Sequence, residues 1–258
     1  MYGGRDPREL SLYGPRDAAA CLNLPEKTIL NWLAGHDSFR SVLTVKPGQR
    51  QLSFYNLCEA FVLSELRRRS RYSLQVVRKI IAELRVEYPS LKYPLAQLDL
   101  QAVDSDAFLA RTAEATASSP SGKLYQKSGQ AKARAELFAK NGDEALINIS
   151  DRGRRLVFES VVNVFLKRVD RTPIEGVVRL YPFITPSRDP NAPKSVMVDA
   201  RVAFGKPVIA GTGIPTAAVY QLFNAGDTIQ KIADEYERDP AEIESAIRYE
   251  SVRAKRAA

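Results

Sequence analysis

Apolar residues near the start of the chain recur at the three- and four-residue spacing of amphipathic helices. Pro15 opens the first of two such runs, and proline is favoured at the first position of a helix. Asn23-Leu24-Pro25 separates the two runs. The inward positions are predicted to be Ala18, Ala19 and Leu22 in the first helix, and Ile29, Leu30, Trp32 and Leu33 in the second. Two short helices joined by a tight turn form a helix-turn-helix.

An apolar segment with a turn at its centre follows this pair. Val42–Val45 and Gln51–Phe54 flank Pro47-Gly48, a strong turn signal, so the pattern predicts a β-hairpin. A hairpin at this place would be a wing beside the helix-turn-helix. Lys46 and Arg50 would lie at its tip.

Two longer helical patterns complete the first ninety residues. Ser53 is the predicted cap of a helix that ends near Arg69, and Ser73 is the predicted cap of a helix that ends before Pro89. The inward positions are Leu57, Phe61, Val62 and Leu66 in the first, and Val77, Ile80, Ile81 and Leu84 in the second.

The middle of the chain mixes strand and helix patterns. Residues 123–127, 145–150 and 175–181 are predicted strands, and residues 151–167 carry apolar positions at helical spacing. This order indicates a small α+β layer. The Pro-, Asp- and Asn-rich segment Pro186–Lys194 is a predicted linker.

The last sixty residues predict two short strands and three helices. The strands are 196–198 and 207–209, and Gly211-Thr-Gly213 is a tight turn in which glycine supplies conformational freedom. Helices then begin at Pro215, after the cap Thr228, and at Asp239-Pro240. Their inward positions include Ile229, Ile232, Ala233, Tyr236, Ile243, Ala246 and Ile247. The three helices form a second unit of helix-turn-helix type.

These elements together predict an α+β, mostly helical chain with three units. The first is a winged helix-turn-helix over residues 1–90, the second an α+β connector over 91–194, and the third a three-helix unit over 195–258. The third helix of the last unit exposes Glu242 and Glu244 at its start, where carboxylates would repel phosphates. That unit is therefore better suited to a protein partner or to dimerisation.

Charge and composition narrow the function. The net charge is +8, of which +5 falls in residues 1–90, and a basic domain favours a polyanionic partner such as DNA. No apolar run approaches the roughly 18 residues of a membrane span, and the amino terminus lacks a signal-peptide core, so we expect a cytoplasmic protein. Cys21, Cys58 and the single His36 do not form a metal motif or a catalytic set. We expect no cofactor, no metal and no enzymatic activity.

The outer face of the second helix carries the first candidate site. Lys27, Thr28 and Asn31 are residue types suited to phosphate contact and base-edge hydrogen bonds. Together with Lys46 and Arg50 of the expected wing they are the candidate DNA-binding residues. The alternative is an ordinary solvated helix face.

The order of elements over residues 11–88 resembles the MerR-like winged fold. Its features are the helix-turn-helix, the wing, the helix that begins Leu-Ser-Phe-x-Asn-Leu-x-Glu, and the helix that begins Tyr-Ser-Leu-x-x-Val-Arg. The resemblance implies DNA binding. It does not extend to the effector chemistry of MerR proteins, because no coiled coil or metal-binding cysteine set follows.

A second resemblance covers residues 195–250. Gly205-Lys206-Pro207, Gly211-Thr-x-Ile-Pro215 and the Ala-Gly-Asp-Thr run at 225–228 resemble a bacterial domain family of unknown function. That family recurs in antitoxins paired with PIN-like ribonuclease toxins, and the whole chain looks like a larger VapB-type antitoxin. The family usually has Arg after Gly-Thr, where this chain has Gly213, so that contact is lost or taken over by Arg201.

The resemblance implies an antitoxin that binds and neutralises a PIN-like ribonuclease toxin and represses its own operon. It would bind a palindromic operator as a homodimer or as part of a higher toxin–antitoxin assembly. A basic side chain entering the toxin's carboxylate-lined site is the simplest inhibitory chemistry, and the candidates are Arg201, Lys206, Arg253, Lys255 and Arg256. For the last three the alternative is a frayed, solvated tail. The alternative function is a stand-alone MerR-like regulator that senses a small ligand in the middle unit.

Overall fold

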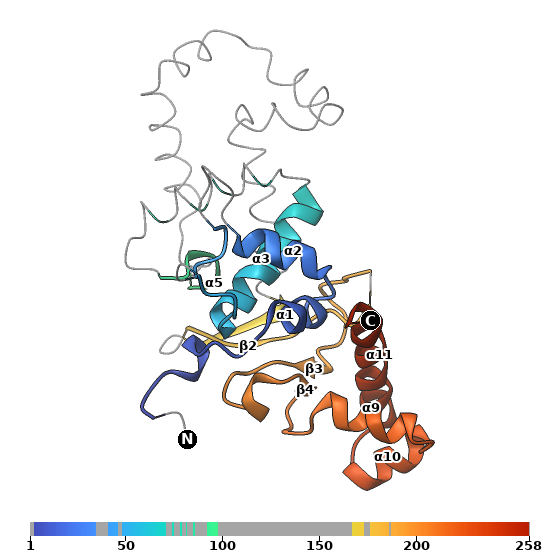
Figure 1. Ribbon diagram of the computed structural model, residues 1–258. Helices are drawn as coiled ribbons and strands as arrows, with labels where there is room; N and C mark the ends of the chain where they lie inside the picture. Colours follow the sequence, from blue (N-terminus) through green and yellow to red (C-terminus); the bar gives the residue numbers. More distant parts are fainter. Residues whose placement is uncertain are drawn as a thin grey trace, which may run out of the picture.

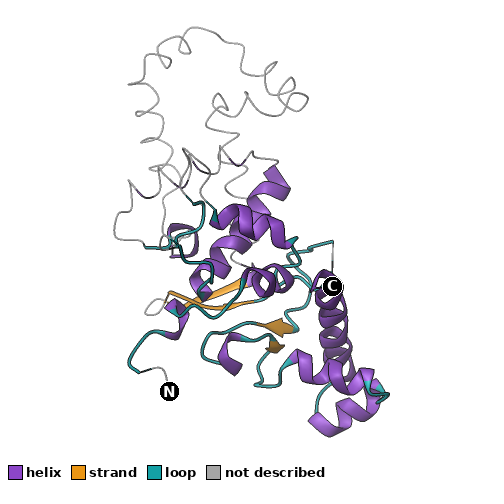
Figure 2. Ribbon diagram, in the orientation of Figure 1, coloured by secondary structure: helices purple, strands orange, loops and turns teal. Residues whose placement is uncertain are grey.

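The computed structural model of the chain describes the single helical positions 74, 78, 81 and 85 and the ranges 3–34, 41–45, 48–70, 92–97, 167–172, 176–185 and 187–257. The strands expected at 123–127 and 145–150, and nearly all of the helix expected at 151–167, lie outside these residues. In Figures 1 and 2 the strands lie between the N-terminal helices and the C-terminal helices. The fold is therefore helical with a small central β layer, as expected for an α+β chain.

The first two predicted helices are present as α1 (Pro15–Cys21) and α2 (Glu26–Leu33). In the turn between them Asn23 has a left-handed φ of 52°, a conformation that Asn adopts more readily than most residues. The predicted inward residues that are buried are Ala18, Ala19, Leu22, Ile29 and Trp32. The prediction that Leu30 is buried is wrong, because its side chain is 40% exposed. Leu30 lies three residues from Lys27 and next to Asn31, so it shares their outer face.

The long helix predicted after Ser53 is α3 (Phe54–Ser70). Ser53 caps it as expected, because its Oγ accepts from the Asn56 N–H at 3.2 Å. The four predicted inward side chains, Leu57, Phe61, Val62 and Leu66, are all buried. For the helix expected after Ser73, the structure describes helical residues at 74, 78, 81 and 85, of which Ile81 is buried. A short helix, α5 (Pro94–Gln97), follows.

The predicted hairpin is not formed by the described residues of its two arms. Leu52 instead pairs antiparallel with Tyr13, and both exchange backbone hydrogen bonds across that bridge. Val42 and Leu43 are consecutive and both buried, so they cannot belong to a half-exposed strand. Val42 N–H donates to the Trp32 carbonyl at 3.1 Å, so this segment closes the end of α2.

The β layer consists of two antiparallel pairs joined by a bridge. The predicted strand at 175–181 is β2 (Gly176–Leu180), and it pairs with β1 (Val169–Thr172), which the sequence pattern did not predict. The strands predicted at 196–198 and 207–209 are β3 (Val196–Met197) and β4 (Val208–Ile209). Leu180 and Val198 exchange backbone hydrogen bonds of 3.0 and 2.8 Å, which join the two pairs.

The C-terminal unit (residues 195–257) ends in the three predicted helices. They are α9 (Thr216–Asn224), α10 (Ile229–Tyr236) and α11 (Pro240–Ala257). Thr228 caps α10, because its Oγ1 accepts from the Lys231 N–H at 3.2 Å. Asp239 Oδ1 accepts from the Ala241 N–H at 2.7 Å at the start of α11. In Figure 1 the carboxyl-terminal end of α11 lies close to α1, and the two helices are in contact.

The main hydrophobic core crosses the boundaries predicted at residues 90 and 194. It contains side chains of α1, α2 and α3, together with Ala96 of α5, Val177 of β2, and Val198 and Ala200 of the C-terminal unit. A second cluster, which includes Val219, Ile232 and Ile243, packs α9, α10 and α11 against one another. The C-terminal unit thus has its own helical core and also contributes to the core of the first unit.

The segment predicted to be a linker is anchored through Arg188. Its guanidinium forms an ion pair with Glu65 at 2.6 Å and donates to Ser64 Oγ at 3.1 Å, both on α3. Arg188 also donates to two backbone carbonyls in the turn after α1. Both members of the ion pair are buried. The segment from residue 187 is therefore a structural clamp, and the prediction of a plain linker is wrong.

We predict that Arg188→Met lowers the free energy of unfolding by about 3–5 kcal/mol, because the Glu65 carboxylate is then buried without this cation. Urea unfolding followed by fluorescence of Trp32, the only tryptophan, measures the change. The double variant Arg188→Met/Glu65→Leu should recover part of the loss.

The matched control is Arg248→Met. Arg248 and Glu244 form an ion pair at 2.6 Å, but both side chains are exposed. An exposed pair on one helix contributes about 0.5 kcal/mol or less. Equal losses in the two variants would contradict a clamp at Arg188.

Candidate functional site

The outer surface of α2 presents the first candidate site. Lys27, Leu30 and Asn31 are exposed and lie at i, i+3 and i+4, so they share one face of the helix. Thr28, also predicted to contact DNA, is half-buried, and its N–H donates to the Pro25 carbonyl at 2.9 Å. The structure therefore brings two of the predicted polar residues together with one apolar side chain.

Of the two residues expected in the wing, Lys46 lies outside the described residues. Arg50 is exposed, but it lies on the segment that leads to the Tyr13–Leu52 bridge and not on a hairpin. Its assignment to DNA therefore stays a prediction without the geometry that motivated it.

The far end of α2 is held by a buried polar cluster. The Trp32 carbonyl accepts from Ser41 Oγ at 2.9 Å and from the Val42 N–H. Two residues later, Thr44 donates its N–H to Glu59 Oε2 at 3.1 Å, and Asn56 Nδ2 donates to the Thr44 carbonyl at 2.9 Å. This cluster ties the segment after α2 to α3.

Glu59 is the titratable member of this cluster. Burial raises the pKa of its carboxyl from the usual value near 4.5 to about 7. The hydrogen bonds from Thr44 and Asn56 and the charge of Arg85 act in the opposite direction but do not cancel the effect of burial. The group therefore changes its charge near neutral pH.

The carboxyl-terminal end of α1 is closed by side chains from remote parts of the chain. The Cys21 carbonyl accepts from Tyr249 Oη of α11 at 3.1 Å. The next two carbonyls, of Leu22 and Asn23, accept from Arg188 Nη2 at 3.0 and 3.2 Å. Carbonyls at a helix end lack partners within the helix, so these contacts satisfy them and set the turn that leads to α2.

A left-handed turn marks the second candidate site, and we call residues 203–206 the Phe204 turn. Ala203, Phe204 and Gly205 have φ values of 46°, 56° and 76° in succession. Tyr13 Oη donates to the Gly205 carbonyl at 3.0 Å, and a Cβ at position 205 would lie only 2.4 Å from that hydroxyl oxygen. Glycine is therefore required there, and Phe204 is left 60% exposed.

A cleft of about 260 Å³ opens beside this turn, between the first unit and the C-terminal unit. Its walls include Tyr13, Asp17 and Cys21 on one side and Phe204, Lys206 and Pro207 on the other. Both cysteines of the chain are buried, and neither forms a disulfide. Burial raises the pKa of the Cys21 thiol to about 11, so this group is not a nucleophile at neutral pH.

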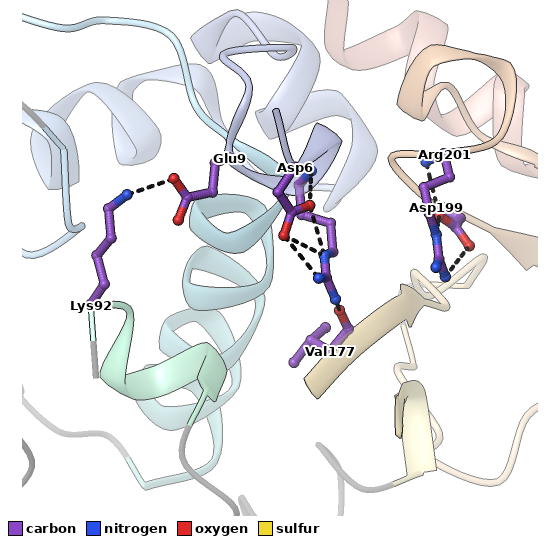
Figure 3. Close-up of polar contacts among 7 residues, drawn as sticks. Asp6, Glu9, Lys92, Val177, Asp199 and Arg201 are labelled. Atoms are coloured by element: carbon purple, nitrogen blue, oxygen red, sulfur yellow. Dashed lines mark hydrogen bonds and ion pairs between the residues drawn. The ribbon is translucent and has the colours of Figure 1, made fainter. Parts of the chain in front are cut away.

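Two of the predicted toxin-binding cations flank the Phe204 turn. Lys206 is exposed at its end. Arg201 is exposed before it, and its Nε lies 3.3 Å from Asp199 Oδ1, so the buried carboxylate orients the guanidinium (Figure 3). The structure therefore brings Arg201 and Lys206 to the same loop.

Polar contacts also fasten the amino-terminal segment nearby. Asp6 accepts from Arg8 at the start of the short helix η1 (Pro7–Glu9), and Arg8 Nη1 donates to the Val177 carbonyl of β2 at 3.1 Å. Glu9 pairs with Lys92 at 2.8 Å (Figure 3). These contacts fix the segment that carries Tyr13 towards the Phe204 turn.

The predicted basic tail is only partly available to a partner. Arg253 Nη1 lies 3.2 Å from both carboxylate oxygens of Glu250, and the guanidinium is 4.0 Å from Asp17 of α1. Arg253 thus belongs to the contact between α11 and α1, and the expectation of a frayed end is wrong for it. Lys255 is exposed on α11, whereas the side chain of Arg256 is outside the described set.

Gly213, where the resembled family usually has Arg, lies in an exposed turn. Thr212 Oγ1 accepts from the Ile214 N–H at 3.0 Å and closes that turn. A Cβ at position 213 would meet no heavy atom within 4 Å. The departure from the family is therefore not forced by packing, and Arg201 does not occupy the same loop.

Sequence reasoning missed Phe204, Arg188 and Tyr249. Phe204 followed by Gly205 carries a weak signal, because glycine after an aromatic residue in a loop permits a left-handed turn. Arg188 and Tyr249 carry no local signal. Among the described residues no group of three His, Cys, Asp or Glu side chains could hold a metal ion, and no described helix is long and apolar enough to cross a membrane.

Comparisons with known proteins show what the chain is similar to. Residues 196–249 match DUF433, a family described as proteins of unknown function. Over 256 residues, 93% of each chain, the sequence is 22% identical to a Mycobacterium tuberculosis protein described as "Putative antitoxin VapB45". The chain is similar to VapB-type antitoxins along nearly its whole length. This confirms the resemblance predicted from residues 195–250.

A solved structure shows the same fold. The crystal structure of Rv2018 from Mycobacterium tuberculosis superposes with a TM-score of 0.63 and 22% sequence identity. The match covers 92% of this chain and 98% of the other. The arrangement of the units is therefore that of a known fold.

We predict that the stability of the protein falls between pH 5 and pH 7 through Glu59. The folded state raises this pKa, so the protonated carboxyl is favoured and its contribution is fully present below pH 4.5 and lost as the pH rises through about 7. The difference amounts to roughly 3 kcal/mol. Glu59→Gln should flatten this pH dependence and be more stable than wild type at pH 8, measured by urea unfolding across pH.

Geometry permits the glutamine, because its amide group can donate to Thr44 Oγ1, which lies 3.2 Å from Glu59 Oε1. Parallel pH profiles for the two proteins would show that Glu59 is not the titrating group.

Proposed function

We propose that the protein is an antitoxin that binds and neutralises a PIN-like ribonuclease and represses its own operon by binding operator DNA. The observation that carries this proposal is the similarity, over 93% of both chains, to the protein described as "Putative antitoxin VapB45". The DUF433 match supports the same assignment for the C-terminal unit. An antitoxin acts by binding, so we propose no enzymatic activity.

The exposed face of α2 supports the DNA-binding part of the proposal. Lys27 can contact a phosphate and Asn31 can hydrogen-bond to a base edge, most favourably adenine. Leu30 between them can contact the methyl group of thymine. Residues 1–90 carry a net charge of +5, which favours association with a polyanion. As a homodimer the protein would bind two half-sites of a palindrome.

The C-terminal unit supports the toxin-binding part. Residues 195–258 contain 8 basic and 9 acidic residues, a net charge of −1, so the unit as a whole is poorly suited to DNA. Its exposed cations Arg201, Lys206 and Lys255 suit a partner that carries carboxylates. We therefore assign the ribonuclease to this unit and DNA to the first.

We predict that Lys27→Ala/Asn31→Ala weakens specific binding to the protein's own promoter DNA by at least about tenfold, because the base contact of Asn31 contributes about 1–3 kcal/mol and the phosphate contact of Lys27 is lost as well. Gel shift or fluorescence anisotropy measures the affinity, and Trp32 in the same helix reports that the fold is intact. Lys231→Ala, on the exposed side of α10, is the control and should bind as wild type does. Retained specific binding by the double variant would place DNA on another surface.

We predict that the purified protein inhibits the PIN-like ribonuclease of its own operon in a 1:1 titration of RNA cleavage. The inhibition should be relieved at high salt, since cations facing carboxylates are screened. Uninhibited cleavage at a tenfold molar excess would remove the antitoxin assignment and favour the stand-alone regulator that responds to a small ligand.

A further inference from the structure

We propose that Phe204 is the apolar anchor through which the C-terminal unit binds its protein partner, with Arg201 and Lys206 as flanking cations. The partner surface that fits is an apolar pocket bordered by carboxylates. This inference rests on the proposed antitoxin function and identifies the surface that meets the ribonuclease.

The conformation of the Phe204 turn is the first observation. Two non-glycine residues, Ala203 and Phe204, have positive φ before Gly205, and a left-handed backbone is unfavourable for both. Such a conformation persists only where the surroundings impose it. Here the Tyr13 hydroxyl donates to the Gly205 carbonyl, and the Gly205 N–H donates to the Val202 carbonyl at 2.9 Å. The packing thus maintains a strained turn.

The result of that strain is the second observation. Phe204 is 60% exposed, the most exposed of the large apolar side chains that the structure describes. It lines the cleft between the two units. An aromatic side chain on a rigid turn loses little conformational freedom on binding, and aromatic anchors contribute most of the binding energy in many interfaces.

The charges around Phe204 indicate the chemistry of the partner. Arg201 and Lys206 lie three residues before and two residues after Phe204, and both are exposed. The buried Asp199 carboxylate, 3.3 Å from Arg201 Nε, offsets part of the charge of Arg201, and Lys206 adds a second exposed cation beside Phe204. The adjacent cleft is lined by Asp17 and by Arg253, whose guanidinium lies 4.0 Å from that carboxylate, so the cleft itself carries charges of both signs. The acidic active site expected of a PIN-like ribonuclease fits the chemistry of this surface.

The experiment uses Phe204→Asn in the full-length chain. Asparagine adopts the left-handed conformation more readily than phenylalanine, so the anchor is lost while the turn is retained. The melting temperature should be unchanged or raised. The matched control is Phe223→Asn, which removes a phenylalanine that is 40% exposed on α9 of the same unit.

The probe is the PIN-like ribonuclease of the same operon, titrated into each variant by calorimetry. We expect Phe204→Asn to weaken binding by roughly 30-fold. Phe223→Asn should bind as wild type does. Lys206→Gln should weaken binding less and reduce its dependence on salt. Photo-cross-linking from p-benzoylphenylalanine should capture the ribonuclease from position 204 and not from position 223, which tests the contact independently of any loss of stability.

Each contrary outcome has a distinct meaning. If Phe204→Asn binds the ribonuclease with the same affinity as wild type, this inference is overturned and the proposed antitoxin function is unaffected. Equal losses in the two phenylalanine variants also overturn it. Weaker DNA binding without weaker ribonuclease binding would assign the turn to nucleic acid instead. Absence of any wild-type binding to the ribonuclease overturns both the inference and the proposed function.

Discussion

The end of α1 is the point on which the arrangement of the chain depends. A helix ends with carbonyls that have no partner inside it, and a buried carbonyl without a hydrogen bond destabilises the fold. Here the carbonyls of Cys21, Leu22 and Asn23 are satisfied by Tyr249 and Arg188. The turn that sets the angle between α1 and α2 is therefore defined by residues 166 and 228 positions away from the groups they contact. The orientation of the proposed DNA-binding helix follows from packing at the opposite end of the sequence.

The contact between the first unit and the C-terminal unit also explains why a strained turn persists at residues 203–205. Tyr13 pairs with Leu52 through its backbone and donates its hydroxyl to Gly205, so one residue connects the first unit to the Phe204 turn. A buried hydrogen bond to a carbonyl stabilises the fold by about 1 kcal/mol, which offsets part of the unfavourable left-handed backbone. Left-handed backbone at non-glycine residues costs stability and persists only where the surrounding structure imposes it.

Local signals predicted most of the helices correctly. Ser53, Thr228 and Asp239 cap helices where expected because a capping residue acts on N–H groups two or three positions away. Strands were harder. The hairpin predicted as a wing is not formed by the described residues of its arms, because Leu52 pairs with Tyr13 instead. The turn signal at Pro47-Gly48 cannot indicate that partner. β1 was missed because Asp170, Arg171 and Thr172 mask the short apolar pattern that its partner β2 displays.

The candidate site could be predicted only in part, for the same reason. Lys27 and Asn31 share a helical face whose period is visible in the sequence, and the structure confirms that both are exposed. The ion pair of Arg253 with Asp17 could not be predicted, because the position of Arg253 on α11 gives no indication that α1 lies beside it. Arg188 lies in a segment of turn-forming composition, so only the structure reveals its ion pair with Glu65.

The capping of α1 limits how such a chain can be rearranged by recombination. Domains joined by a flexible linker are exchanged as separate cassettes, each bringing its own core. Transplanting residues 1–90 alone would leave three carbonyls at the end of α1 without Arg188 and Tyr249. A chain that combines a new N-terminal unit with this C-terminal unit would therefore also need a matching arginine, a matching tyrosine and a complementary surface between the two units. The sequences of the two ends of the chain are therefore expected to change together in evolution.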